Sequence, residues 1–458
     1  MSKRKNRLSR RSFMKLGGGF LAAAATTRYL PRPIGQSGEV VQAAPFSQVA
    51  PTPPDIYLVG TDGWIYLPGQ VPIPGTTGQY YIPDDLAPPG FTAYMFGYRD
   101  VTGQTEDQIW QQKMKCQATA PLFWVNQEQE YRLKLGNLGL QMRPDLIDDH
   151  TVHWHGFRNA WPIFDGEPHS SVSVPIGRDL TLYYKPHHPG TYMYHCHFEE
   201  TEHLHMGMTG SVFVRPVQDQ GGLTQGGQTI PSGRLAGNPD PAAPMGYVYN
   251  DGVLPGDPLS TAFDREFVLC MTDVWAEAHW DDSHIQLPDW TNFRADYNLM
   301  NGRVYPDTIA PNGQGTDANG DLIAPPGHPE LQYQPISSLI ACNAGDRVLI
   351  RLINLTFSVD AFTVPGLKLK VVGQDATHLK GTDGTVHAYD TNTIFVGTGG
   401  TVDAIFEAPQ VDTMTKYLLY NRNYSRLSNP GTPGPGGQMT EIHVYPAGTL
   451  PPQTGPNT

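Results

Sequence analysis

The sequence predicts an all-β protein with two β-sandwich domains, and three observations support this prediction. Its 458 residues suit two domains of ordinary size. It contains 49 Gly and 42 Pro but only 16% charged residues, which is typical of a turn-rich globular protein and not of a disordered polyelectrolyte. Short apolar segments alternate with turn residues over most of the chain, as antiparallel sandwiches require.

The N-terminus is expected to be a targeting segment. Residues 9–15 read Ser-Arg-Arg-Ser-Phe-Met-Lys, which matches a twin-arginine signal. The apolar stretch 16–25 that follows is too short and too glycine-rich for a transmembrane helix. We therefore expect residues 1–44 to be a signal and linker, and the protein to be exported to the periplasm or beyond. Residues 45–106, rich in Pro, Gly and Tyr, are expected to form an extended N-terminal arm.

The remaining chain divides by composition. A first domain is predicted over residues 107–216, and glycine and proline mark residues 217–260 as a linker. A second domain is predicted over residues 261–446, with a long polar insertion at 275–335, and residues 447–458 form a tail. The alternating patterns that predict strands lie at 121–125, 130–135, 172–176, 180–184, 190–194, 210–215, 265–273, 346–354, 367–372, 393–396, 401–406, 417–420 and 439–445.

Metal-binding side chains are concentrated in two segments of the first domain. One thiol, several imidazoles and a thioether in a short stretch suit a copper ion that cycles between Cu(I) and Cu(II). Structural zinc on His-Cys-His and chance occurrence are the alternatives. The candidate ligands are His150, His153, His155, His195, Cys196, His197, His203, His205 and Met208.

Strand alternation sorts these side chains into two sets, because neighbouring residues of a strand point to opposite faces. The first set, which matches a His2Cys site with an axial methionine, is His150, Cys196, His203 and Met208. The second set, on the opposite side, is His153, His155, His195 and His197. A short covalent path through Cys196 joins the two sets, as electron transfer between two copper centres would need.

His205 is a surplus candidate on a segment that we expect to be an exposed loop. It either replaces His203 as a ligand or completes a cluster on the far face, and its spacing from Cys196 and Met208 favours His203. His169, His187 and His188 belong to no motif and are expected on the surface. A second His-rich segment, 279–284, is read as a solvated polar loop in preference to a metal site.

Residues 120–216 resemble the first domain of a multicopper oxidase. The matching segments are Thr151–Gly156, Asp165–Gly166, Pro175–Gly177 and Gly190–His197. The resemblance implies Greek-key cupredoxin-like sandwiches, with the first set as type 1 copper ligands and the second set as half of a type 2/type 3 cluster. In most three-domain members the cysteine lies in the last domain. Its place in the first domain here is similar to copper nitrite reductases and two-domain oxidases.

The second domain resembles the copper-free middle domain of three-domain members at 298–303 and 351–354. A complete cluster in this family uses eight histidines, four from each of two domains, but no second-domain histidine here occurs as His-x-His. Arg422 stands where nitrite reductases have a third type 2 histidine, and His153 stands where they have a catalytic aspartate. Both departures argue against nitrite reduction by the known mechanism.

The resemblance implies a laccase-like oxidoreductase. It would oxidise a small-molecule, metal-ion or redox-protein reductant at type 1 copper and reduce dioxygen at the second set. The alternative is a blue-copper electron-transfer or copper-binding protein with an incomplete cluster, and a weaker one is a structural sandwich with vestigial motifs. The resemblance to two-domain relatives implies a homo-oligomer, with a trimer as the expected form, in which a second chain would reach the cluster. The net charge of −13 argues against nucleic-acid partners.

The four cysteines leave disulfide bonding open. With Cys196 assigned to copper, an odd number remains, so at least one has no partner in the chain. Cys270 and Cys342 lie in strand-like segments of the second domain, where a disulfide and buried free thiols are both compatible with export, and Cys116 lies near the first domain.

Overall fold

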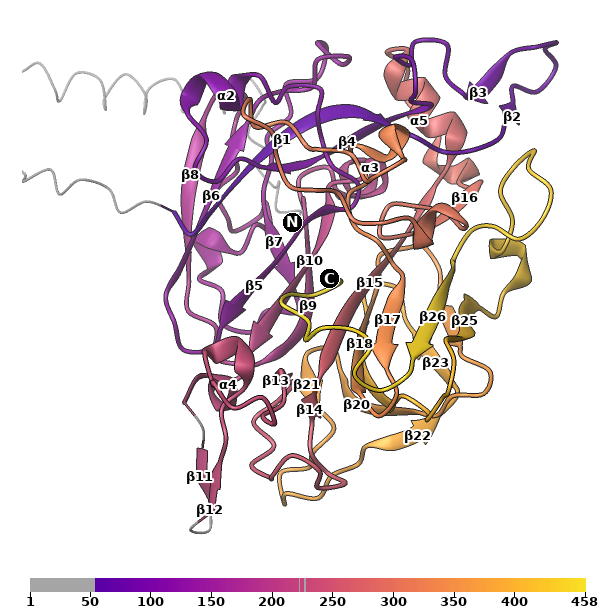
Figure 1. Ribbon diagram of the computed structural model, residues 1–458. Helices are drawn as coiled ribbons and strands as arrows, with labels where there is room; N and C mark the ends of the chain where they lie inside the picture. The colour runs from indigo at the N-terminus through magenta and orange to yellow at the C-terminus, as the bar shows by residue number, and fades with distance from the viewer. Residues whose placement is uncertain (1–53, 222, 226–227) are drawn as a thin grey trace, which may run out of the picture. The chain divides into compact units, whose positions relative to one another are not determined.

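The computed structural model describes residues 54–221, 223–225 and 228–458, so the expected twin-arginine signal lies outside the described residues. Within them, no helix is long and apolar enough to cross a membrane. The described chain is rich in strands with few helices, which confirms the predicted all-β class (Figure 1).

The first sandwich consists of two four-stranded sheets, drawn in indigo to magenta in Figure 1. One sheet has the order β4 (Ala93–Asp100), β1 (Ile56–Ile65), β6 (Tyr131–Asn137), β8 (Asp179–Tyr184). The other has the order β5 (Ala120–Asn126), β10 (Thr209–Arg215), β9 (Gly190–His195), β7 (His153–His155).

The segment expected as an N-terminal arm contributes half of the first of these sheets. Strand β1 pairs antiparallel with β4 and parallel with β6, so it lies in the interior of the sheet. The expected boundary at residue 107 therefore does not separate two structural units. Two short strands, β2 (Val71–Pro72) and β3 (Tyr80–Ile82), form a hairpin between β1 and β4.

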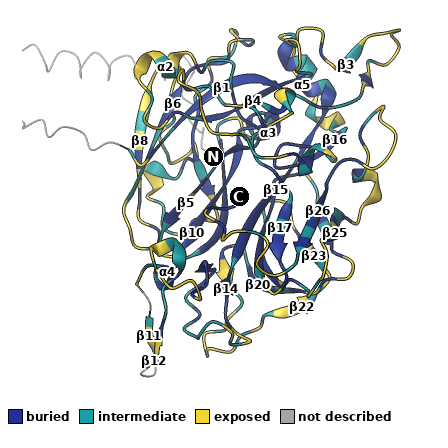
Figure 2. Cartoon of the chain, viewed as in Figure 1, coloured by how far each residue is buried: buried dark blue, intermediate teal, exposed yellow. Residues whose placement is uncertain are grey.

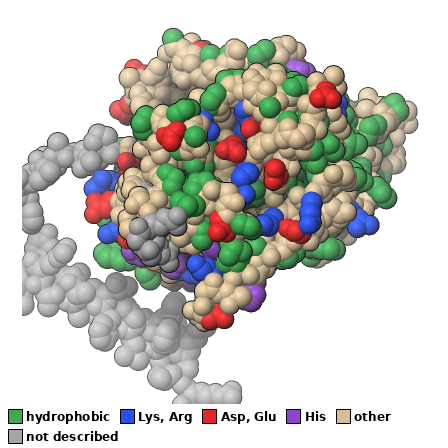
Figure 3. All heavy atoms as spheres, turned by 60° about the horizontal axis from the view of Figure 1, so that its bottom comes forward, with side chains coloured by type: hydrophobic (Ala, Val, Ile, Leu, Met, Phe, Trp, Pro, Cys, Tyr) green, Lys and Arg blue, Asp and Glu red, His purple; other side chains and the backbone are tan. Residues whose placement is uncertain are grey.

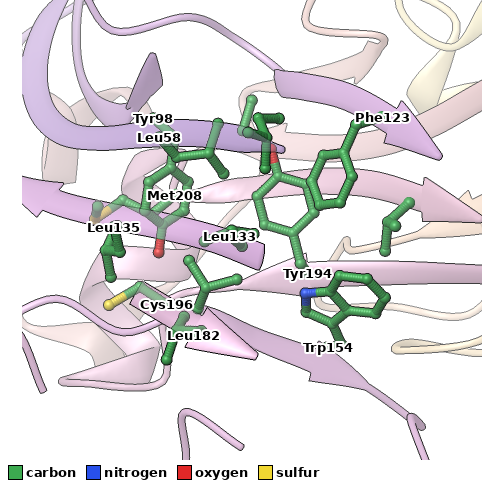
Figure 4. Packing of buried hydrophobic residues seen from close by; sticks show 14 of the residues in the cluster. Leu58, Tyr98, Phe123, Leu133, Leu135, Trp154, Leu182, Tyr194, Cys196 and Met208 are labelled. Atoms are coloured by element: carbon green, nitrogen blue, oxygen red, sulfur yellow. The ribbon is translucent and has the colours of Figure 1, made fainter. Parts of the chain in front are cut away.

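Aromatic rings fill the core of the first sandwich, as Figure 4 shows. The rings of Trp154 and Tyr184 stack with centroids 4.5 Å apart, and those of Phe123 and Tyr194 lie 5.1 Å apart. Such pairs add to the burial of apolar area, so the first pair holds β7 against β8 and the second holds β5 against β9. Cys196 and Met208 belong to this same buried cluster (Figure 4). Figure 2 shows the strands of the first sandwich mostly in the colour of buried residues.

The second sandwich, orange to yellow in Figure 1, packs a seven-stranded sheet on a five-stranded one. The first contains β16 (Tyr297–Met300), β15 (Arg265–Val274), β18 (Arg347–Asn354), β24 (Thr401–Glu407), β20 (Leu369–Gln374), β21 (Thr377–His378) and β22 (Tyr389–Thr391). The second contains β17 (Ile340–Asn343), β26 (Met439–Tyr445), β25 (Thr415–Asn421), β19 (Asp360–Thr363) and β23 (Thr393–Val396).

Short elements connect the two sandwiches. The linker contains α4 (Val217–Gly221), β11 (Leu223–Gln225), β12 (Gln228–Ile230), β13 (Gly246–Tyr247) and β14 (Ala262–Phe263). The other helices are α2 (Glu106–Trp110), α3 (Glu200–Met206) and α5 (Ala276–Ser283). Short 3₁₀ turns cover Pro162–Phe164, Arg234–Ala236, Trp290–Asn292, Asp307–Ile309, Pro329–Leu331 and Tyr424–Arg426.

The expected polar insertion 275–335 is a packed part of the fold. Apolar residues of this segment share a buried cluster with residues of β1 and β4. The carbonyl of Gly320 accepts a hydrogen bond from Arg99, and Lys115 pairs with Asp321 at 2.8 Å. The segment predicted as a polar insertion therefore also contributes apolar side chains that are buried against the first sandwich.

A buried ion cluster joins the two sandwiches. Arg351 of β18 contacts Glu266 and Asp403 at 3.2 and 3.4 Å, and donates to the hydroxyl of Thr191 from β9 at 2.9 Å. Arg215 of β10 pairs with the same Glu266. Charges buried in this way must be paired, so the cluster specifies how β9 and β10 meet β18.

All four cysteines of the sequence lie within the described residues, and all are buried free thiols. Of the two possibilities for Cys270 and Cys342, the structure has the unpaired one. The face shown in Figure 3 carries acidic and basic side chains interspersed with apolar ones.

Candidate metal centre

Strand pairing determines which way the candidate ligands point. In the β7–β9 ladder, His153 lies opposite His195 and Trp154 lies opposite Tyr194. Opposed residues share a face, so the two histidines are on one side and the two aromatic rings are on the other, in the core. Cys196 follows His195 and turns toward the core side, where it is fully buried.

The first set converges in the core of the first sandwich. The Sγ of Cys196 lies 3.3 Å from Nδ1 of His203, and a ring nitrogen of His150 lies within 4.8 Å of both donor atoms. Both ring nitrogens of His150 are buried without a hydrogen-bond partner. Burial of an unpaired polar atom costs free energy, and a bound metal ion would supply the missing partner. Met208 is fully buried. These soft and borderline donors fit copper.

Hydrogen bonds hold the thiol loop in place. The backbone N–H of Thr151 donates to the Cys196 Sγ at 3.5 Å, and the Thr151 hydroxyl accepts from the N–H of His197 at 2.9 Å. The N–H of Met208 donates to the carbonyl of His203 at 2.9 Å. Thr151, the neighbour of His150, therefore links the segment of His150 to the loop that contains Cys196 and His197.

The electrostatics of the first set favour a thiolate facing a charged imidazole. Burial alone would lower the pKa of His203, but the Cys196 thiolate and Asp148 raise it to about 10. Burial would raise the pKa of Cys196, but His203 and His150 lower it well below its ordinary value. Deprotonated sulfur is the form that binds metal. Asp148 Oδ2 lies 3.2 Å from Nε2 of His203, the ring nitrogen that faces away from the thiol.

Gly60 is a site residue that the sequence analysis missed. It lies in the middle of β1, and a Cβ at this position would lie 2.4 Å from Cδ2 of His150 and 3.1 Å from Cε of Met208. Only glycine leaves room for both side chains. A glycine inside a predicted strand signals such a close approach, but it does not say to what.

In the second set, three imidazoles converge. Donor atoms of His153, His155 and His195 all lie within 4.8 Å of one another. Nδ1 of His153 contacts the carbonyl of Asp165 at 2.7 Å, and Nδ1 of His195 contacts the carbonyl of Cys196 at 3.0 Å. When Nδ1 of each ring donates its proton to the carbonyl, the lone pair of Nε2 is left free to bind a metal. Nε2 of His195 lies 3.4 Å from Nδ1 of His155.

His197 stands beside this group. Its ring centroid is 5.0 Å from that of His153, and its Nε2 is 3.8 Å from Oε2 of Glu200, another residue that the sequence analysis missed. Burial lowers the pKa of His195 to about 3 and also lowers that of His155. Both are therefore neutral at pH 7, the form in which imidazole binds a metal.

His205 joins neither set, which corrects its expected role as a ligand. The segment expected as an exposed loop is helix α3, and two residues along a helix turn a side chain by about 200°. His205 therefore points away from His203. It is buried, its Nε2 accepts the N–H of Trp275 at 3.0 Å, and its ring lies 5.2 Å from that of His279.

The segment 279–284 is not the solvated loop that was expected. His279 is buried in α5, with Nδ1 2.6 Å from the carbonyl of Tyr94. His284 lies near Asp84 and Asp85. Of the described second-domain histidines, none joins either set; these are His279, His284, His328, His378, His387 and His443. His169, His187 and His188 are exposed, as expected.

Comparison with known families agrees with this geometry. Two multicopper oxidase models match residues 94–218 and 266–445, which together span about two thirds of the 458 residues. The chain belongs to the multicopper oxidase family. Copper is the cofactor of this family, whose members use reductant substrates and dioxygen.

Two solved structures with TM-scores of 0.50 share the fold at low sequence identity. The blue copper oxidase from Nitrosomonas europaea is 18% identical, with 85% of each chain covered and a TM-score of 0.50. The multicopper oxidase mgLAC is 17% identical, with 86% of each chain covered and a TM-score of 0.50. A copper nitrite reductase from Nitrosomonas europaea is 13% identical over 87% of this chain and 95% of its own, with a TM-score of 0.46. No curated protein matches the sequence.

Proposed function

We propose that the protein is a laccase-like oxidoreductase that couples one-electron oxidation of a reductant to dioxygen reduction. The first set would hold type 1 copper, and the second set would provide the histidines at which dioxygen reacts. The observation that carries this proposal is the place of Cys196. Its sulfur belongs to the first set, while His195 and His197 on either side belong to the second.

Copper supplies a couple between Cu(I) and Cu(II) when bound. The residues of this chain provide the surroundings. Cys196 provides a path of a few covalent bonds between the two sets, and Thr151 holds that path rigid through its contacts with Cys196 and His197. The aromatic and aliphatic core around Cys196 and Met208 excludes water from the thiol (Figure 4).

The reductant would approach the first set at the edge of His203. Nε2 of this ring contacts Asp148, and the exposed Glu199 lies with them in one group of donor atoms within 4.8 Å. Two carboxylates at the edge of a copper ligand attract cations. A cationic reductant, such as a metal ion, is therefore favoured over a neutral phenol.

A partner chain is proposed on the exposed side of the second set. The loop that holds His153 through the Asp165 carbonyl carries Trp161, which is 68% exposed, and Ile163, which is 49% exposed. Exposed apolar side chains of this kind mark interaction surfaces. A homo-oligomer, with a trimer as the proposed form, would cover these side chains. Light scattering of the copper-loaded protein measures its mass, and a monomer at all concentrations would contradict this part.

A copper count with an oxygen electrode tests the main proposal. The copper-loaded protein should contain more than one copper per chain, absorb near ~600 nm as a His2Cys site does, and consume oxygen with a cationic reductant. Cys196→Ser should abolish both the band and the oxygen uptake. One copper per chain without oxygen uptake from phenols, metal ions or ferrocyanide would instead support the alternative, a blue-copper electron carrier. That alternative is favoured by the lack of second-domain histidines at the second set among the described residues.

Export by the twin-arginine route is proposed from the residues Arg10 and Arg11. Replacement of both by lysine should retain the protein in the cytoplasm of the producing cell, whereas a Lys3→Arg, Lys5→Arg control should still be exported. Cell fractionation with an antibody makes the comparison, and export of the double lysine variant would contradict the proposal.

A further inference from the structure

The side chain of His205 is buried among aromatic rings of the second domain. Its Nε2 accepts a hydrogen bond from the backbone N–H of Trp275 at 3.0 Å. Four rings lie around the imidazole, with centroids 5.2 to 5.5 Å from its own. These four rings, which we name the socket, are those of His279, Trp290, Phe293 and Phe357. A side chain of the first domain is thus held by residues of the second.

His205 and His203 occupy opposite faces of one short helix. Helix α3 has seven residues, and two positions along a helix differ in direction by about 200°. The imidazole of His203 enters the first set, where it meets Cys196, while that of His205 enters the socket. A rotation of α3 that withdrew His203 from Cys196 would therefore also withdraw His205 from the socket.

The second domain also supports the strand that packs on His203. Nδ1 of His279 in α5 lies 2.6 Å from the carbonyl oxygen of Tyr94 in β4. Two residues further along β4, the ring of Phe96 meets that of His203 with centroids 5.9 Å apart. A Cβ on Gly207, which ends α3, would lie 2.7 Å from the carbonyl oxygen of Phe96. Helices α3 and α5 thus both contact β4, as Figure 1 shows, and His203 is supported from two sides.

We propose that His205 is a positioning residue for the first set, and that the second domain uses the socket to fix the candidate copper ligands His203 and Met208. This role gives the domain without copper motifs a task within its own chain. The inference rests on the proposed function only in taking the first set as the copper site. Ligands that are held rigidly cannot rearrange toward the tetragonal geometry that Cu(II) favours. Loss of the socket should therefore favour Cu(II) over Cu(I).

The ratio of Cu(I) to Cu(II) affinity measures this effect. The ratio determines the reduction potential of the bound copper, whereas a general loss of stability weakens both affinities alike. Competition titrations with each ion are made on the full chain. His205→Leu cannot accept the Trp275 N–H, and it should lower the ratio about tenfold, as expected for one buried donor left unpaired, and shift the ~600 nm band. His205→Gln keeps an oxygen that can accept this N–H, and its ratio should stay close to that of wild type.

Two further variants test whether the socket acts from the second domain. Trp290→Leu removes one ring of the socket and should lower the ratio in the same direction as His205→Leu. Gln334→Leu is the matched control, because this buried side chain joins the N–H and the carbonyl of Tyr66, which belongs to neither set, at 2.9 Å each. It should lower the unfolding midpoint and leave the ratio unchanged. A wild-type ratio in either socket variant, or an equal change in Gln334→Leu, would overturn the positioning role.

A measurement without copper separates failure of this inference from failure of the proposed function. In the copper-free protein a thiol reagent labels a buried cysteine only when the structure opens, and mass spectrometry gives the rate at each cysteine. His205→Leu should raise the labelling rate of Cys196 about tenfold and leave that of Cys116, which is also a buried free thiol, unchanged. Equal acceleration at both cysteines would overturn the inference, because it indicates general unfolding. Failure of the wild-type protein to bind copper overturns the proposed function, whereas selective labelling of Cys196 would still assign His205 to the position of the thiol loop.

Discussion

Replacement of Gly60 by alanine is the sharpest test of the first set, because one methyl group is added at a known distance. The new Cβ would lie 2.4 Å from Cδ2 of His150, whereas carbon atoms in contact are normally about 3.5–4.0 Å apart. The overlap exceeds about 1 Å, so either the His150 ring or strand β1 must move. Overpacking of a core costs about 1–3 kcal/mol.

This free-energy cost should weaken copper binding, because the imidazole that moves belongs to a proposed copper ligand. A loss of about 1–3 kcal/mol corresponds to a roughly 5- to 150-fold weaker copper affinity, at about 1.4 kcal/mol per factor of ten. Copper titration followed at the ~600 nm band measures it. Gly136→Ala is the matched control, because its Cβ would meet the movable hydroxyl end of Tyr57 at 3.0 Å. Copper affinity within twofold of wild type in Gly60→Ala would refute the reasoning.

Three further predictions concern charge. In the copper-free protein, the Cys196–His203 pair should stabilise the fold evenly between about pH 6.5 and 9, the ordinary pKa values of the two groups. Below about pH 6.5 the stabilisation should decrease as the pH falls, because the pKa of Cys196 is depressed in the folded state. Above about pH 9 it should decrease as the pH rises toward about 10, because the pKa of His203 is raised in the folded state. Urea unfolding of wild type and Cys196→Ser measures the difference in stability at each pH, and a steady slope between about pH 6.5 and 9 would contradict the prediction. Asp148→Asn should lower kcat/KM about tenfold for a cationic reductant and leave kcat/KM for a neutral phenol within twofold of wild type. Equal losses for the two reductants would argue against a cation site. Arg351→Met should cost about 3–5 kcal/mol by leaving buried carboxylates unpaired, whereas Lys368→Met, whose side chain is 75% exposed, should cost less than about 1 kcal/mol; similar unfolding midpoints for the two variants would refute it.

Local pattern predicted the separation of the ligands into two sets. The period of a strand places the neighbours His195 and Cys196 on opposite faces, and the β7–β9 register puts His153 on the same face as His195. The all-β class likewise followed from alternation and turn residues. Both are properties of a few neighbouring residues, which the sequence displays directly.

Helix α3 was missed because its sequence carries few helix signals. It is short, it begins after Glu199 with a φ of +46°, and it ends at Gly207. Its position between Cys196 and Met208 is stabilised by contacts of the loop and not by helix propensity. Because that helix was missed, His205 was expected to be a surplus metal ligand, whereas in the structure it joins neither set.

The sequence alone determined the kind of donors, their spacing and the face to which each strand residue points, because these depend on covalent order and strand period. Only the tertiary structure decided what lies opposite them: Gly60 against His150, Asp148 against His203, and Gly399 against His155. These contacts join residues far apart in the chain. They are set by how two sandwiches pack around buried charges, which no local pattern encodes.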